Sequence, residues 1–89
     1  ELSSGVASLE IVPNPMNSEA TVSFVADKPA NYTMRITDVT GKVVSAKELE
    51  GRTGENRTTV ERNNLPAGVY FLSLTDGKNA VTKRFSVTE

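Results

Sequence analysis

The sequence contains no cysteine, no histidine and no tryptophan among its 89 residues. Without cysteine, the chain forms no disulfide and offers no thiolate for catalysis or metal binding. Without histidine, it lacks both the commonest metal ligand and the commonest general base. We therefore expect neither an enzyme nor a cofactor-binding protein.

The chain also has almost no net charge, since ten basic residues oppose eleven acidic ones. Balanced charge creates no positive field, so we expect no nucleic-acid partner. No run of 18 or more apolar residues occurs, and we predict no membrane-spanning helix. Asp27, Asp38 and Asp76 each lie in a turn or loop signal that explains them. Neither a metal site nor a catalytic pair of carboxylates is therefore expected.

What the sequence does contain is a two-residue alternation of apolar and polar side chains. The stretches "ATVSFVA" and "YTMRITD" place their large apolar residues on one face of an extended chain. No stretch of ten residues shows the three-to-four spacing of an amphipathic helix. Seven short stretches are predicted to form strands: 9–12, 20–26, 32–38, 42–49, 57–62, 69–75 and 81–87.

Turn residues separate these stretches about every ten positions. In "DVTG" at 38–41, aspartate and glycine occupy the first and fourth positions of a type I turn. In "LPAG" at 65–68, proline is second and glycine is fourth. A chain of this length forms one domain. The pattern predicts an all-β fold, an antiparallel two-sheet sandwich of about seven strands.

The strongest local prediction is a hairpin at "TDGK", residues 75–78. Asp-Gly adopts positive φ readily and favours a two-residue turn. With that loop, Lys83 lies opposite Tyr70, in the core-facing row that also holds Phe85 and Val87. We expect Lys83 to lie along the Tyr70 ring with its ammonium in water, where it protects an edge strand from aggregation. Recognition of Lys83 by a partner is compatible with that structural role.

Four motifs stand in a recognisable order: "PNP" after the first strand, "DVTGKVV", "LPAGVYFLSL" and a terminal "TKRFSV". From about Leu9 to Thr88 the chain resembles the type A C-terminal sorting domain of the type IX secretion system, found in Bacteroidetes. Ser86 interrupts an apolar run that is often continuous in that family, and two residues follow Val87. The residues that match the family motifs are Pro13, Asn14, Pro15, Asp38, Gly41, Gly68, Tyr70, Lys83, Arg84, Phe85 and Val87.

The resemblance implies a sorting signal and not an enzyme. It implies an immunoglobulin-like sandwich at the C-terminus of a cargo protein that a signal peptide has already brought to the periplasm. The outer-membrane translocon and its shuttle proteins would recognise the domain. A surface sortase would then cut on its N-terminal side and attach the cargo to anionic lipopolysaccharide. We expect residues 9–89 to form the sorting domain and residues 1–8 the linker near the cut, with the cargo at the cell surface or secreted.

The opening "ELSSGVAS" has neither a charged start nor an apolar stretch, so we expect the export signal on a longer precursor. The resemblance assigns recognition by the translocon to Lys83, Arg84, Phe85 and Val87. We hypothesise that an extended last strand is read by strand addition.

Exposed strand edges would also allow a homodimer. The alternative function is an immunoglobulin-like module that binds carbohydrate or a neighbouring surface protein. The chain has no tryptophan for a binding platform, and Phe71 is the one aromatic residue predicted outside the core rows.

Overall fold

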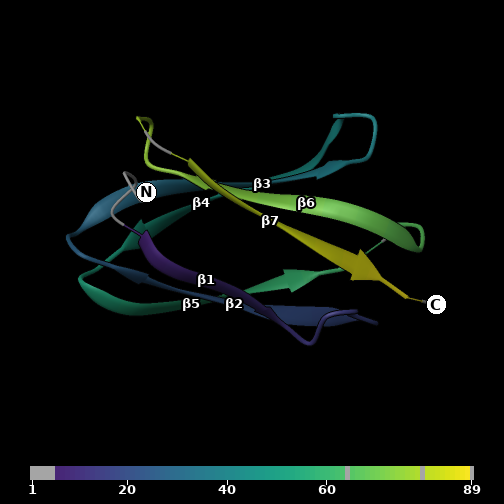
Figure 1. Ribbon diagram of the computed structural model, residues 1–89, viewed down its shortest axis with the longest axis horizontal. Helices are drawn as coiled ribbons and strands as arrows, with labels where there is room; N and C mark the ends of the chain where they lie inside the picture. The colour runs from purple at the N-terminus through teal and green to yellow at the C-terminus, as the bar shows by residue number, and fades with distance from the viewer. Residues whose placement is uncertain (1–5, 64, 79, 89) are drawn as a thin grey trace.

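The fold is a sandwich of two antiparallel sheets, described by a computed structural model for residues 6–63, 65–78 and 80–88. One sheet has the strand order β1-β2-β5 and the other β4-β3-β6-β7 (Figure 1). This architecture confirms the predicted all-β sandwich. Within these residues, no helix is long and apolar enough to cross a membrane. The strands are β1 (Val6–Val12), β2 (Glu19–Ala26), β3 (Ala30–Asp38), β4 (Val43–Gly51), β5 (Gly54–Glu61), β6 (Gly68–Thr75) and β7 (Ala80–Val87).

The alternation of the sequence becomes an alternation of burial, most regularly in β2, β3 and β6. Every second side chain of these strands faces the space between the two sheets. Burial of each large apolar side chain stabilises the fold by about 1.5–3 kcal/mol relative to exposure. The core consists of Leu9, Ile11, Met16, Ala20, Val22, Phe24, Ala26, Tyr32, Met34, Ile36, Val60, Tyr70, Leu72, Leu74, Phe85 and Val87.

Two aromatic pairs lie in this core. The rings of Phe24 in β2 and Tyr32 in β3 meet edge to face, with centroids 5.2 Å apart, and so join the two sheets. The rings of Tyr70 in β6 and Phe85 in β7 stack with centroids 5.8 Å apart. These four aromatic residues are buried as predicted, whereas Phe71 on the outer face is partly exposed.

The stretches with the weakest alternation lie at sheet edges. β4 and β5 are outer strands of their sheets, which confirms the expectation that the polar β5 segment is an edge strand. Lys47 Nζ in β4 donates hydrogen bonds to Thr58 Oγ1 at 2.8 Å and to the Thr59 carbonyl at 3.4 Å. This side chain links β4 to β5, and therefore one sheet to the other, along one side of the sandwich.

The register of the last hairpin differs from the prediction by two residues. Thr75 pairs with Ala80, so four residues, 76–79, form the connection in place of two. Lys83 consequently lies opposite Leu72 and not opposite Tyr70. The predicted contact between Lys83 and the Tyr70 ring is therefore wrong. A two-residue shift preserves the face on which each side chain lies, so the predicted inward row of β7 is retained.

Packing explains why the longer connection prevails over the turn preference of Asp-Gly. In the observed register Phe85 lies opposite Tyr70, and its ring is 1% exposed. With a two-residue loop, Lys83 would occupy that place and Phe85 would move toward the end of β6. The side chain of Asp76 accepts a hydrogen bond from Lys78 N at 2.9 Å, so one main-chain N–H of the longer loop has a partner within the loop. Leu74 pairs with Val81, so its predicted pairing with Asn79, which itself lies outside the described residues, is also wrong.

The first strand begins earlier than expected. β1 starts at Val6, so residues 6–8 of the segment assigned to the linker belong to a strand of the sandwich. Residues 1–5, which make up the rest of that segment, lie outside the described residues.

Candidate functional site at the C-terminal strand

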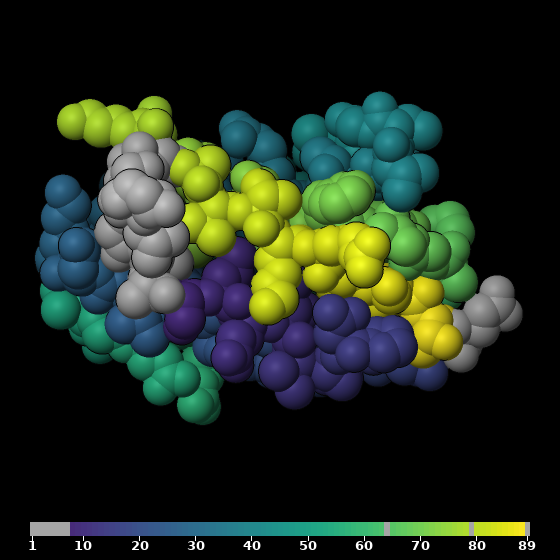
Figure 2. All heavy atoms as spheres, in the orientation of Figure 1, coloured from purple at the N-terminus to yellow at the C-terminus, as the bar shows by residue number. Residues whose placement is uncertain are grey.

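β7 is the outer strand of the four-stranded sheet and crosses the front of the molecule beside β1 (Figure 1). Figure 2 shows this yellow strand lying open on the surface, above the purple N-terminal residues. Of the four residues assigned to recognition, Lys83 and Arg84 are exposed, whereas Phe85 and Val87 are 1% and 3% exposed. Of these four side chains, only the two basic ones are accessible to a partner of the folded domain.

The backbone of β7 has one side paired and one side facing away from the sheet. In an antiparallel ladder, the N–H and C=O of one residue point to the same side of the strand, and those of the next residue point to the other side. Ser86 N and O bond to segments outside the sheet, so the peptide groups of Thr82 and Arg84 point the same way. Among the described residues, these outward groups of Thr82 and Arg84 have no hydrogen-bond partner. Within residues 6–63, 65–78 and 80–88, this part of β7 is an unpaired strand edge, which we call the free edge.

The end of β7 is instead covered by the segment Pro13–Asn17, which we call the strap. Met16 N donates to Ser86 O at 2.9 Å, and Thr88 N donates to Met16 O at 2.8 Å, which forms a short parallel bridge. Asn14 Oδ1 accepts a hydrogen bond from Ser86 N at 3.1 Å. The "PNP" motif and the terminal motif are therefore in direct contact, through two residues that are 72 positions apart in sequence. Sequence reasoning missed this contact, because it identified the prolines only as a stiff exit from β1.

The strap is anchored by one buried side chain. Met16 is 0% exposed within the core, while Pro13, Asn14 and Pro15 are exposed. Proline lacks an N–H, so Pro13 and Pro15 bring no unpaired donor to this exposed path. The motif thus presents one side-chain acceptor, Asn14 Oδ1, to β7. The other two hydrogen bonds between the strap and the end of the chain are formed by the main chain of Met16.

Tyr70 and Gly68 support the other side of β7. The Tyr70 hydroxyl donates to the Pro66 carbonyl at 2.6 Å, four residues upstream. This arrangement is the tyrosine corner of immunoglobulin-like sandwiches, and it fixes the entry of the chain into β6. Gly68 pairs with Val87 at the end of the same ladder. Both motif residues therefore act on the geometry of the last strand.

Asp38 and Gly41 form the turn between β3 and β4, at the other edge of the four-stranded sheet from β7. Gly41 N donates to Asp38 O at 3.0 Å, which confirms the predicted β-turn over residues 38–41. Gly41 has φ of 91°, a conformation that glycine adopts without a steric cost. Oδ1 of Asp38 accepts hydrogen bonds from Thr40 Oγ1 at 2.6 Å, Thr40 N at 2.9 Å and Lys42 N at 3.1 Å. These contacts are structural and lie within the turn.

The environment of Asp38 predicts that the stability of the domain depends on pH. The hydrogen bond from the Thr40 hydroxyl, with smaller contributions from the Lys42 and Thr40 amides, lowers the pKa of Asp38 below its ordinary value. A carboxyl whose folded pKa is lowered stabilises the fold above its unfolded pKa, and this contribution is lost as the pH falls through the folded pKa. We expect wild type to be more stable than Asp38→Asn at about pH 6, and the difference to shrink as the pH falls below the ordinary aspartate pKa of about 3.9. Thermal unfolding at a series of pH values measures this, and a difference independent of pH would contradict it.

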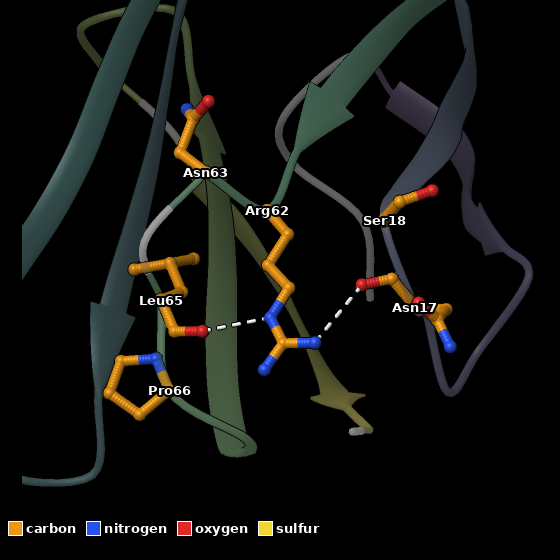
Figure 3. A pocket seen from close by; sticks show the side chains of 6 residues that line it. All are labelled: Asn17, Ser18, Arg62, Asn63, Leu65 and Pro66. Atoms are coloured by element: carbon orange, nitrogen blue, oxygen red, sulfur yellow. Dashed lines mark hydrogen bonds between the residues drawn. The ribbon is translucent and has the colours of Figure 1, made fainter.

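Arg62 is a residue that the sequence analysis did not single out, and it lies where three segments meet (Figure 3). Its Nε donates to Leu65 O at 2.9 Å, and its Nη1 donates to Thr88 O at 2.7 Å and Asn17 O at 3.3 Å. The guanidinium borders an open groove of about 470 Å³, lined by Asn17, Ser18, Arg62, Asn63, Leu65 and Pro66. The signal for it in sequence was only an arginine in a polar crossover, which has no spacing pattern.

The described residues contain no group of three or more histidine, cysteine, aspartate or glutamate side chains able to hold a metal ion. The hydrogen bonds at the site join backbone groups to each other and to the side chains of Asn14 and Arg62. The arrangement presents an exposed basic pair and a free backbone edge. Such features suit recognition by another chain.

Two sheets of three and four strands with a tyrosine corner define the class, an immunoglobulin-like β-sandwich. A similar structure is a DUF3244 family protein from Bacteroides vulgatus, described as having an immunoglobulin-like β-sandwich fold. It aligns with TM-score 0.58 and 21% identity over 98% of this chain and 100% of its own. A β-glucosidase from Listeria innocua, solved in complex with glucose, aligns with TM-score 0.57 and 13% identity over 94% of this chain. The chain spans only 15% of that enzyme, and both likenesses concern the fold alone.

The chain belongs to the family of secretion system C-terminal sorting domains, which it matches over residues 10–88. This match confirms the resemblance to the type IX sorting domain and includes all eleven motif residues. No curated protein matches the chain. Membership implies interaction with the type IX secretion machinery and export to the cell surface or into the medium.

Proposed function

We propose that this domain directs a cargo protein from the periplasm through the outer-membrane translocon of the type IX system, and that it catalyses no reaction itself. The observation that carries the proposal is the family match together with an ordered, surface-lying last strand. Shuttle proteins receive the domain on the periplasmic side. A surface sortase then cuts in the linker before the sandwich and transfers the cargo to lipopolysaccharide.

Recognition is divided between side chains and backbone. Lys83 and Arg84, which are exposed, offer two positive charges to the translocon. Phe85 and Val87, which are buried, act indirectly because they hold β7 on the core. The free edge at Thr82 and Arg84 accepts a strand of the partner, whose main-chain groups complete the hydrogen bonding. The strap excludes such a strand from Ser86, so addition is confined to the first part of β7.

The test is a transplant of residues 1–89 onto a reporter that is exported to the periplasm of a bacterium with a type IX system. We expect the reporter to appear at the cell surface, as measured by protease accessibility in intact cells. The same reporter without the domain remains periplasmic and serves as the control. A fusion that stays in the periplasm although its domain is folded would contradict the sorting function.

The transplant also separates this proposal from the binding-module alternative. The partly exposed Phe71 lies on the outer face of the four-stranded sheet, between Thr37 of β3 and Arg84 of β7. A module that uses this face would bind its ligand after Phe71→Ala only weakly, and it would not relocate a reporter. If the Phe71→Ala fusion still reaches the cell surface, the result supports sorting. If the wild-type and the Phe71→Ala fusions both stay in the periplasm, the result favours the binding module.

A further inference from the structure

Arg62 connects three parts of the chain that meet at one end of the sandwich. It directly follows β5 of the three-stranded sheet, and its own N–H donates to Ser18 O at 2.9 Å. Its guanidinium reaches Leu65 in the crossover, Asn17 in the strap and Thr88 just after β7. The shortest of these three contacts, 2.7 Å, is made to Thr88. One side chain thus ties the end of the recognition strand to the other sheet.

The chemistry of these contacts explains why an arginine is needed. A guanidinium carries five N–H donors in a rigid planar fork, whereas a lysine ammonium is a single flexible point donor. The acceptors are three main-chain carbonyls, one bonded to Nε and two bonded to Nη1. Among the described residues, Arg62 forms no salt bridge; the one found joins Arg57 to Glu55. The positive charge of Arg62 is therefore directed to main-chain oxygens and not to an acidic side chain.

Apart from the bond to Arg62, few contacts hold the last residues of the described chain in place. Beyond the β6 ladder, Ser86 and Thr88 are held by Asn14 and Met16 of the strap. The strap in turn is tied to the sandwich by the buried Met16 and by the bond from Arg62 to Asn17. Loss of Arg62 removes the contact to Thr88 and loosens the segment that pairs with it. No other described side chain joins the strap and Thr88 at once.

We infer that Arg62 is a positioning residue of the sorting signal, which holds the end of β7 and the strap in the geometry that the translocon reads. The inference rests on the proposed sorting function. Arg62 lies 20 or more residues from every member of the terminal motif, and it touches neither Lys83 nor Arg84. Its action is indirect, through the placement of the strand.

The first measurement is amide exchange, residue by residue, on the 89-residue domain. In Arg62→Ala we expect the Ser86 and Thr88 amides to exchange about ten- to a hundredfold faster, because charge-assisted hydrogen bonds are lost. Amides in the middle of β2 and β3 should change far less. Arg62→Lys keeps the charge but loses the fork, so its Thr88 amide should exchange nearly as fast as in Arg62→Ala. Wild-type exchange in Arg62→Lys would show that charge alone suffices and would overturn the role of the fork.

The second measurement is surface display of the reporter fusion. We expect Arg62→Ala to reduce display at least about fivefold, while Arg57→Ala, an exposed arginine on β5, leaves it unchanged. Val22→Ala, a core change in the middle of β2 and outside the strap, serves as a control for lost stability. If Val22→Ala lowers display as much as Arg62→Ala at equal thermal stability, Arg62 is merely structural and the inference is wrong. Full display of Arg62→Ala would also overturn it, whereas failure of the wild-type fusion would overturn the sorting function itself.

Discussion

Phe85→Ala is expected to unfold the domain, or nearly so, and to abolish export. The ring is 1% exposed and stacks on Tyr70, and removal of a buried phenylalanine costs about 3–5 kcal/mol. Domains of this size have a free energy of unfolding of only about 5–15 kcal/mol, so this change removes a large part of it. Denaturant unfolding of the isolated domain measures the loss directly.

The neighbouring Lys83 provides the matched control for Phe85. Lys83→Ala lies in the same row of β7 but is exposed, so we expect a change in stability within about 0.5 kcal/mol. Its effect on export, where present, then reports recognition and not folding. A stable Phe85→Ala domain would show that the last strand is not part of the core, and that the register described above is incorrect.

Thr82→Pro is expected to leave the sandwich folded and to lower surface display at least about tenfold. The N–H of Thr82 points away from β6, and proline is tolerated at edge positions whose N–H faces outward. Strand addition would lose one main-chain hydrogen bond and meet the proline ring, and about 1.4 kcal/mol corresponds to a tenfold change in affinity. Display on intact cells, together with thermal unfolding of the domain, separates the two effects.

Thr82→Ala is the control for this proline variant, because it removes the side chain and keeps the N–H. Normal display of Thr82→Ala with loss in Thr82→Pro would indicate that the backbone edge is read. Equal display of both variants would refute strand addition while leaving the sorting function intact. Deletion of residues 82–89 is a poorer test, since it also removes Phe85 and Val87 from the core.

The fold was predictable from the sequence because its main signal is local. Alternation in stretches such as "ATVSFVA" reports which side chains face the core, and turn residues delimit the less regular stretches. Each of the seven predicted stretches overlaps an observed strand. The connection after β6 was not predictable in the same way. Asp76-Gly77 favours a two-residue turn, but the stacking of Phe85 on Tyr70, which depends on register, outweighs that preference.

The candidate site was only partly predictable. The motif residues were identified by resemblance, yet the contact between Asn14 and Ser86 joins positions 72 residues apart and leaves no periodic trace. Arg62 is less visible still, because its partners are main-chain carbonyls, and these have the same chemistry at every residue. Such contacts depend on which segments the fold brings together. A local sequence pattern does not reveal this, because it is determined by the whole fold.

The strap makes the start of the sandwich depend on residues far along the chain. Asn14 and Met16 form their hydrogen bonds with Ser86 and Thr88, so without those two residues the same groups bond to water and the strap is not held. A polypeptide that stops before Phe85 also lacks the ring that fills the space beside Tyr70. A chain cut before Phe85 is therefore expected to lack the folded domain, because both the strap and the core lose their partners in β7.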